Sequence, residues 1–284
     1  MDSVKDTFCN YNGHLISIYE PMVSFANRAF RYGDALFETV RVINGKIMFL
    51  SDHMRRIKIG MTMLRMNIPN ELSADSIAKL IHQLIQVNEI KADVRVRFTV
   101  FRNEGGFYTP VSNDISFIIE TEPLTDSGYK LNDSGYHVDV YHDIKKPKNR
   151  LATLKSGNAL IYVLAGIYKR DIKLDDVILL NEEGNICESV SSNIFFVKNG
   201  ALYTPSLSEG CVEGVLRKQI LDIAQSNRIL CYEINIPLNT MLNSDEVFLT
   251  NAIQGIRWVG EYKTKSYQNK MAGFMIQKLN ELSA

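Results

Sequence analysis

Cysteine is scarce in this sequence, and the few cysteines form no recognisable pattern. The 284 residues include only four, Cys9, Cys187, Cys211 and Cys231, and none belongs to a C-x-x-C motif. This spacing indicates neither a disulfide framework nor a zinc site, and the five histidines lack metal-ligand spacing. We therefore expect no bound metal and a reducing compartment, the cytoplasm.

An excess of one charge and long apolar runs are also missing. The 32 basic and 32 acidic side chains cancel, whereas a nucleic-acid-binding protein is expected to carry a net basic balance or a basic stripe. The one dense basic run, Lys145–Lys148, is short, and we interpret it as a solvated loop. No stretch approaches the roughly 20 apolar residues of a membrane span, and the polar N-terminus lacks the apolar core of a signal peptide. We expect neither nucleic-acid nor membrane partners.

The composition that remains is that of a globular protein, with 45% apolar and 23% charged residues. A chain of 284 residues exceeds the usual single domain of about 100 to 150 residues, so we expect two domains. Residues 123–135 are rich in Thr, Asp, Ser and Gly, which is typical of a loop. We predict a smaller N-terminal domain at 1–122, a linker at 123–135 and a larger C-terminal domain at 136–284.

Hydrophobic periodicity predicts both strands and helices in each domain. In the first domain we expect strands at 14–19, 36–43, 46–50, 93–101 and 114–120, and helices at 51–66, with Ser51 as N-cap, and 73–87. In the second we expect strands at 137–142, 176–181, 185–188, 193–197, 201–204, 231–234 and 246–250, and helices at 156–169, 214–227 and 267–282. Because strands and helices do not alternate strictly, the fold class is α+β.

The common nucleotide-binding and serine-hydrolase motifs are absent from the sequence. Six other blocks follow one another instead: Arg31–Arg41 (RYGDALFETVR), Asp52–Ile57 (DHMRRI), Leu154–Asn158 (LKSGN), Glu183–Phe195, Gly214–Arg217 (GVLR) and Glu246–Ala252 (EVFLTNA). In this order and spacing they resemble the class IV pyridoxal-phosphate enzymes, which include branched-chain aminotransferase, D-amino-acid aminotransferase and aminodeoxychorismate lyase.

The resemblance implies a fold, a cofactor and a mode of assembly. The fold is the two-domain fold type IV of pyridoxal-phosphate enzymes, as in D-amino-acid aminotransferase, with the site between the two domains. The cofactor is pyridoxal 5′-phosphate (PLP), the substrates are small amino acids and 2-oxo acids, and the assembly is a homodimer.

Two residues match the positions that carry the family's cofactor chemistry. PLP reacts as an aldehyde, so the site needs an amine that holds it as a Schiff base and then moves the proton at Cα. Lys155 has the matching position and is the expected catalytic residue, forming the aldimine. Glu188 matches the carboxylate that stands beside the ring nitrogen and favours its protonated form.

Further residues match the positions that hold the rest of the cofactor. The phosphate needs an arginine and free N–H groups, and Arg56 aligns with the family's phosphate arginine, whereas its neighbour Arg55 is expected to face solvent. A partly buried Arg56 would also need an anionic partner. The remaining matches lie in three loops: Ser192 and Asn193, then Gly214, Val215 and Leu216 at a helix start, then Thr250, Asn251 and Ala252. Several relatives carry Thr at the position of Leu216, so only backbone contacts are implied there.

Substrate recognition is less well defined by the motifs. Tyr32, Glu38 and Arg97 are the expected substrate-binding residues, with Arg97 preferred over Arg95 for the substrate carboxylate. The loop Gly105–Pro110 lacks the Arg-x-His of D-amino-acid aminotransferases, which disfavours that specificity.

Three functions remain open at this point. The first is an aminotransferase acting on an L-amino acid, branched-chain type preferred, and a 2-oxo acid, to which Glu38 points. The second is an aminodeoxychorismate lyase that releases pyruvate and yields 4-aminobenzoate, to which residues 209–214 and 250–252 point. The third is a binding protein that retains the fold without turnover.

Overall fold

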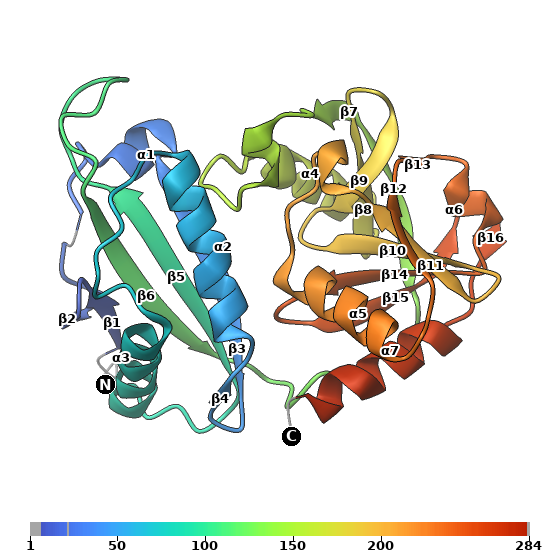
Figure 1. The fold of residues 1–284 in the computed structure, drawn as a ribbon, viewed down its shortest axis with the longest axis horizontal. Coiled ribbons are helices and arrows are strands. Elements are labelled where there is room, and N and C mark those ends of the chain that lie inside the picture. Colours follow the sequence, from blue (N-terminus) through green and yellow to red (C-terminus); the bar gives the residue numbers. More distant parts are fainter. Residues whose placement is uncertain (1–6, 22, 283–284) are drawn as a thin grey trace. The chain divides into compact units, whose positions relative to one another are not determined.

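The computed structural model describes residues 7–21 and 23–282, so the first six residues of the polar N-terminus lie outside the described part. The chain divides into two compact units (Figure 1). The first contains Met1–Gly128 and Lys155–Asn158, and the second contains Tyr129–Leu154 and Ala159–Ala284. The change of unit after Gly128 falls inside the expected linker. Residues 155–158, which the sequence assigned to the second domain, group with the first unit instead.

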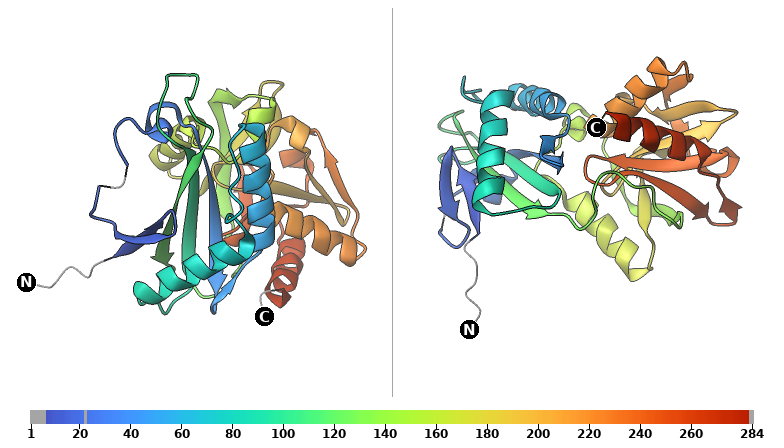
Figure 2. Two further views of the ribbon diagram at one scale, coloured as in Figure 1. Left: turned by 60° about the vertical axis from the view of Figure 1, so that its left-hand side comes forward. Right: turned by 90° about the horizontal axis from the view of Figure 1, so that it is seen from below.

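The first unit is built on a six-stranded antiparallel sheet in the order β2-β1-β6-β5-β3-β4. Its strands are β1 (Phe8–Tyr11), β2 (His14–Ser17), β3 (Ala35–Ile43), β4 (Lys46–Ile47), β5 (Val94–Arg102) and β6 (Ile115–Pro123). Its helices are α1 (Arg28–Tyr32), α2 (Leu50–Met63) and α3 (Ala74–Val87). Helix α2 packs against β3, and α3 packs against β1 and β6 (Figure 2). The apolar positions of β5, Val94, Val96, Phe98 and Val100, are all buried.

Local sequence signals predicted most of this unit. The Asn44-Gly45 turn has positive φ at both residues, 49° and 80°, as a type I′ hairpin turn requires. Ser73 caps α3 by accepting the N–H of Ser76. The expectation that Ser51 caps α2 is wrong: α2 begins at Leu50, and its N-cap is Phe49, which has left-handed backbone and no capping side chain. Strand β1 and helix α1 were not predicted.

The second unit is built on a ten-stranded mixed sheet in the order β12-β11-β10-β14-β15-β7-β8-β9-β13, with β16 paired to β15. The strands are β7 (Tyr136–Lys146), β8 (Asp176–Asn181), β9 (Asn185–Ser189), β10 (Asn193–Lys198), β11 (Ala201–Pro205), β12 (Cys231–Ile234), β13 (Ile236–Pro237), β14 (Glu246–Asn251), β15 (Gly255–Tyr262) and β16 (Lys265–Ser266). The helices are α4 (Leu160–Asp171), α5 (Val215–Ser226), α6 (Thr240–Asn243) and α7 (Lys270–Glu281). Helix α4 packs on β7 and β8, while α5 and α7 pack on β14 and on each other.

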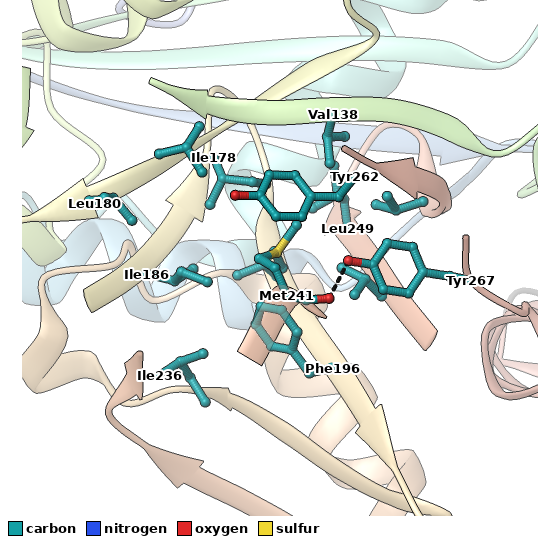
Figure 3. Packing of buried hydrophobic residues seen from close by; sticks show 14 residues of the cluster. Val138, Ile178, Leu180, Ile186, Phe196, Ile236, Met241, Leu249, Tyr262 and Tyr267 are labelled. Atoms are coloured by element: carbon teal, nitrogen blue, oxygen red, sulfur yellow. Dashed lines mark hydrogen bonds between the residues drawn. The ribbon is translucent and has the colours of Figure 1, made fainter. Parts of the chain in front are cut away.

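The sheet of the second unit curls around one apolar core. Strand β9 contacts β10 and β11, strands that are not its hydrogen-bonded neighbours in the sheet order. Figure 3 shows the core, in which Ile178 of β8, Ile186 of β9 and Ile236 of β13 belong to one cluster with Tyr262 and Phe196. The hydroxyl of Tyr267 donates to the carbonyl of Met241 at 2.5 Å, which satisfies the polar end of a mostly buried ring. This packing fixes the strand ends that carry the polar residues described below.

Several predictions for the second half of the chain differ from the structure. The helix expected from Ser156 begins at Leu160 because residues 155–157 pair with β3. The N–H of Phe37 donates to the carbonyl of Lys155 at 2.9 Å, and that of Gly157 to Ala35 at 2.8 Å. Strand β7 continues to Lys146, and β13, β15, β16 and α6 were not predicted. Among residues 7–21 and 23–282, no helix is long and apolar enough to cross a bilayer.

Candidate functional site

Lys155 is held in an extended segment alongside β3 in the first unit. Its carbonyl accepts the N–H of Phe37, and its ammonium nitrogen lies 4.4 Å from the centre of the Phe37 ring. An ammonium over an aromatic face is stabilised electrostatically, more so where water is excluded. Backbone pairing and ring contact together restrict where the Lys155 amine can lie.

Glu38 of β3 joins two residues of α2 in a buried cluster. Arg56 donates from Nε to Oε1 of Glu38 at 2.7 Å and from a terminal nitrogen to Oε2, and Nδ1 of His53 lies 2.6 Å from Oε2. Glu38 and His53 each retain only 1% exposure. Although burial opposes it, Arg56 and His53 lower the pKa of Glu38 to about 2. Burial lowers the pKa of His53, even beside Glu38.

This cluster clarifies three residues singled out in the sequence. Arg56 has the anionic partner that its burial required, and its neighbour Arg55 is exposed as expected. The phosphate-binding role of Arg56 stays a prediction. Both oxygens of Glu38 are engaged by Arg56 and His53, so the structure gives no support to Glu38 as a substrate contact and instead has it orient Arg56.

Arg97 and Tyr32, the other expected substrate residues, also lie in the first unit. The guanidinium carbon of Arg97 lies 4.0 Å from the centre of the Phe37 ring, and no carboxylate within residues 7–21 and 23–282 forms an ion pair with it. Arg95 differs, because it pairs with Glu122 at 3.0 Å. Tyr32 ends α1, and its ring centre lies 5.5 Å from that of Tyr108. Arg97, rather than Arg95, is therefore available to a carboxylate.

Glu188, on β9 of the second unit, carries a buried carboxylate with three donors. The ammonium of Lys146 and the hydroxyl of Tyr162, at 2.6 Å, donate to Oε1, and the N–H of Val212 donates to Oε2 at 2.8 Å. A carboxylate offers about four acceptor positions. One acceptor position, on Oε2, therefore has no hydrogen-bond donor among the described residues.

The sequence did not identify Lys146 and Tyr162 as partners of Glu188. The interpretation of Lys145–Lys148 as a solvated loop is wrong. Lys146 is 3% exposed, and Lys148 pairs with Glu183 at 2.8 Å and Glu209 at 3.2 Å. The pairing of β7 with β8 shifts register between Tyr141 and Lys146, so simple alternation does not predict which side chain points inward. We find no local signal that would have separated Lys146 from its neighbours.

The start of helix α5 has the properties of an anion site. Gly214 is its N-cap, with no side chain capping the helix in the described part of the chain and no acidic residue in its first turn. The N–H groups of Val215 and Leu216 belong to this first turn, where the helix dipole favours negative charge. A Cβ at Gly214 would lie 1.8 Å from Oδ1 of Asn193, so a larger residue here would force the Asn193 side chain to move.

The end of β14 supplies a second set of polar groups in the same unit. Thr250 is 2% exposed, and its hydroxyl has no hydrogen-bond partner among the described residues. The amide of Asn251 donates to the hydroxyl of Ser192 at 2.9 Å, so two of the expected loops meet. The carbonyl of Ala252 accepts the hydroxyl of Tyr129 at 3.1 Å. A buried hydroxyl without a partner is costly, and a bound anion would remove that cost.

These residues fit the chemical groups of PLP. Lys155 offers an amine for the aldehyde, and Glu188 offers an acceptor for a protonated ring nitrogen. The α5 N-terminus and the Thr250 hydroxyl offer donors for the phosphate. Lys155 lies in the first unit, and Glu188, the start of α5 and Thr250 lie in the second. The chemistry of each of these groups is compatible with PLP.

The chain is similar in sequence to proteins of one family along most of its length. The model of the family described as amino-transferase class IV matches residues 35–262. A "Probable branched-chain-amino-acid aminotransferase" of Rickettsia typhi is 30% identical, covering 81% of this chain and 78% of its own length. The aminodeoxychorismate lyase of Bacillus subtilis is 27% identical, with coverages of 85% and 82%.

The fold is similar to that of solved branched-chain aminotransferases. The crystal structure of the enzyme from Thermoproteus uzoniensis with norvaline matches with a TM-score of 0.87 at 22% identity, over 98% of this chain and 95% of that one. This match confirms the two-domain α+β fold. Another solved branched-chain aminotransferase of this fold is complexed with N-(5′-phosphopyridoxyl)-L-glutamate, a derivative of PLP. Because the family model covers most of the sequence, this chain belongs to the class IV aminotransferase family.

Proposed function

We propose that this protein is a PLP-dependent aminotransferase that moves an amino group between an L-amino acid, of branched-chain type, and a 2-oxo acid. The observation that carries the proposal is the buried Glu188 carboxylate, which three donors hold with one acceptor position left for a ring N–H. The relatives named as branched-chain aminotransferases support this substrate class.

Each residue has a distinct task under this proposal. PLP supplies an aldehyde that condenses with amines and a ring that accepts electrons. The amine of Lys155 would hold PLP through its aldehyde carbon and would move the proton at the substrate Cα, and Glu188 would accept a hydrogen bond from the ring N–H. The donor amino acid is oxidised to its 2-oxo acid and the acceptor is reduced, so no outside oxidant is needed.

Other residues bind and orient rather than react. The backbone of Gly214, Val215 and Leu216 and the hydroxyl of Thr250 bind the phosphate, together with Arg56. Arg97 binds the substrate carboxylate, since it lacks the ion pair that occupies Arg95. The other matched loop residues shape these loops through hydrogen bonds: Asn251 donates to Ser192, Ala252 accepts from Tyr129, and the Asn193 amide donates to the Val212 carbonyl at 2.8 Å. The homodimer and the cytoplasmic location expected from the sequence stay predictions, and a mass measurement in solution tests the first.

A substrate panel tests the reaction. Holo-protein incubated with leucine and 2-oxoglutarate is expected to form glutamate, whereas the Lys155→Ala variant is not. If leucine and a panel of other amino donors all fail to yield glutamate, the aminotransferase proposal is wrong.

The second candidate is the lyase, because the Bacillus subtilis relative carries that name. The same Lys155 and Glu188 would then direct elimination of pyruvate from aminodeoxychorismate. Pyruvate release without glutamate formation would favour the lyase. A protein that takes up no PLP, judged by the absence of visible cofactor absorbance, would favour a non-catalytic binding protein instead.

A further inference from the structure

Lys146 and Glu188 form an ion pair inside the second unit, away from solvent. Both side chains retain 4% exposure, and Lys146 reaches Glu188 from the end of β7 while Tyr162 reaches it from α4. The Lys146 ammonium also lies 5.2 Å from the centre of the Tyr162 ring. The Glu188 carboxylate is therefore held from two elements outside its own strand.

The ammonium of Lys146 compensates the charge of the buried Glu188 carboxylate. Burying a lone carboxylate is expensive unless a cation and hydrogen bonds compensate it. The neighbouring thiols of Cys187 and Cys211 do not compete for Lys146, because burial raises the pKa of both, that of Cys211 to about 12. Burial beside Glu188 also raises the pKa of Tyr162, so its hydroxyl remains a donor.

The three donors also determine which acceptor position remains. Lys146 and Tyr162 both bind Oε1, and Val212 binds Oε2. With Oε1 saturated, only Oε2 can accept a further N–H. The carboxylate is thus oriented by groups that the sequence motifs do not include.

We propose that Lys146, with Tyr162, is a positioning residue that holds the Glu188 carboxylate and directs Oε2 at a protonated aromatic nitrogen. This inference rests on the proposed function, because the nitrogen is that of the PLP ring. It predicts a binding preference: the Lys146–Glu188 pair favours binding of a ring that carries N–H over binding of the same ring with C–H in its place. A merely structural role for Lys146 would not distinguish the two rings.

The test compares two ligands across matched variants. Dissociation constants are measured for PLP and for its 1-deaza analogue, in which C–H replaces the ring nitrogen, on the wild-type chain and on Lys146→Met, Lys146→Arg and Lys145→Met. Lys145 is the control because it is the adjacent lysine and is exposed. Lys146→Met is expected to weaken PLP binding about tenfold or more, as loss of a charged hydrogen bond does, and to leave the deaza analogue within about twofold. Lys146→Arg should restore most of the preference for PLP over the deaza analogue. Lys145→Met should bind both ligands as the wild type does.

The outcomes separate this inference from the function on which it rests. Equal weakening of both ligands in Lys146→Met, or no weakening of either, would overturn the role of Lys146. If Lys146→Met does not fold, Tyr162→Phe decides, since loss of its hydroxyl is expected to reduce the preference for PLP in the same direction, and an unchanged preference would contradict the proposal. A wild-type chain that binds neither ligand would instead refute the proposed function.

Discussion

Arg56 binds the buried carboxylate of Glu38 through two nitrogens, one of them Nε at 2.7 Å from Oε1. His53 occupies the second carboxylate oxygen from the same helix. Breaking a buried pair by removing one partner leaves an uncompensated charge. The Glu38–Arg56–His53 cluster therefore fixes the position of Arg56 in the first unit before any phosphate binds. The cluster also makes the stability of that unit depend on pH.

Acidification is expected to destabilise the protein in two steps. The pKa of His53 is lowered from 6.5 in the folded protein. Below pH 6.5, His53 therefore binds a proton in the unfolded chain but not in the folded chain, and the free energy of unfolding falls. The pKa of Glu38 is about 2 rather than 4.5, so its contribution is complete above 4.5 and is lost as pH falls toward 2. That contribution is about 3 kcal/mol at pH 7.

Urea unfolding of the wild type, His53→Gln and Glu38→Gln between pH 3 and 8 measures both steps. His53→Gln should lack the step below pH 6.5, and Glu38→Gln should be the less stable variant at pH 7 and approach the wild type below pH 4.5. Parallel curves for all three proteins would contradict this account of the cluster.

Thr250→Val tests the orphaned hydroxyl. Because the hydroxyl has no partner among the described residues, its removal should leave the stability of the cofactor-free protein unchanged or raise it by up to about 1 kcal/mol. Affinity for PLP should fall about tenfold, and affinity for pyridoxal, which lacks the phosphate, should not change. Thr204→Val is the control, because Thr204 is also buried but donates to the Ile194 carbonyl at 2.8 Å. This variant should be less stable than the wild type but bind PLP with unchanged affinity.

Gly214→Ala tests the close approach at the start of α5. The added Cβ would overlap Oδ1 of Asn193, whose amide donates to the Val212 carbonyl at 2.8 Å. Thermal unfolding should show a loss of about 1 to 3 kcal/mol, and PLP titration a weaker affinity. In Gly273→Ala, by contrast, the new methyl meets nothing within 4 Å inside α7, so a gain of roughly 0.5 to 1 kcal/mol is expected. Similar behaviour of the two variants would show that the contact with Asn193 is unimportant.

Arg97→Met tests the substrate carboxylate site. Since Arg97 is available to an anion, its loss should raise KM for the amino acid and the 2-oxo acid by about 10- to 100-fold. Arg95→Met should stay within about twofold, because a surface pair such as Arg95–Glu122 contributes little. Equal effects of the two substitutions on KM would remove Arg97 from the proposal.

The sequence predicted elements well where the information was local. The bounds of β8 match the expected strand at 176–181, and the alternation in β5 correctly identified its buried positions. The need of Arg56 for an anion could be inferred from its apolar neighbour on the helix, although the identity of that anion, Glu38 on another element, could not.

Predictions failed where distant segments compete with local preference. Residues 155–157 have a helix-compatible pattern but pair with β3, more than 100 residues earlier in the chain. Lys146 looks like its exposed neighbour Lys145, and only the shifted register of β7 and the position of Glu188 turn it inward. Motif resemblance therefore singled out Lys155 and Glu188, whose roles stay predictions, while the groups that hold Glu188 became visible only in the structure.

The central claim is that the ε-amine of Lys155 is the one that bonds the aldehyde of PLP. The direct measurement is borohydride reduction of protein saturated with PLP, followed by proteolysis and mass spectrometry of the peptides. We expect a pyridoxyl mass increment on the peptide that contains Lys155 and its absence from Lys155→Ala. An increment on a different lysine, or no increment in saturated protein, would contradict the claim.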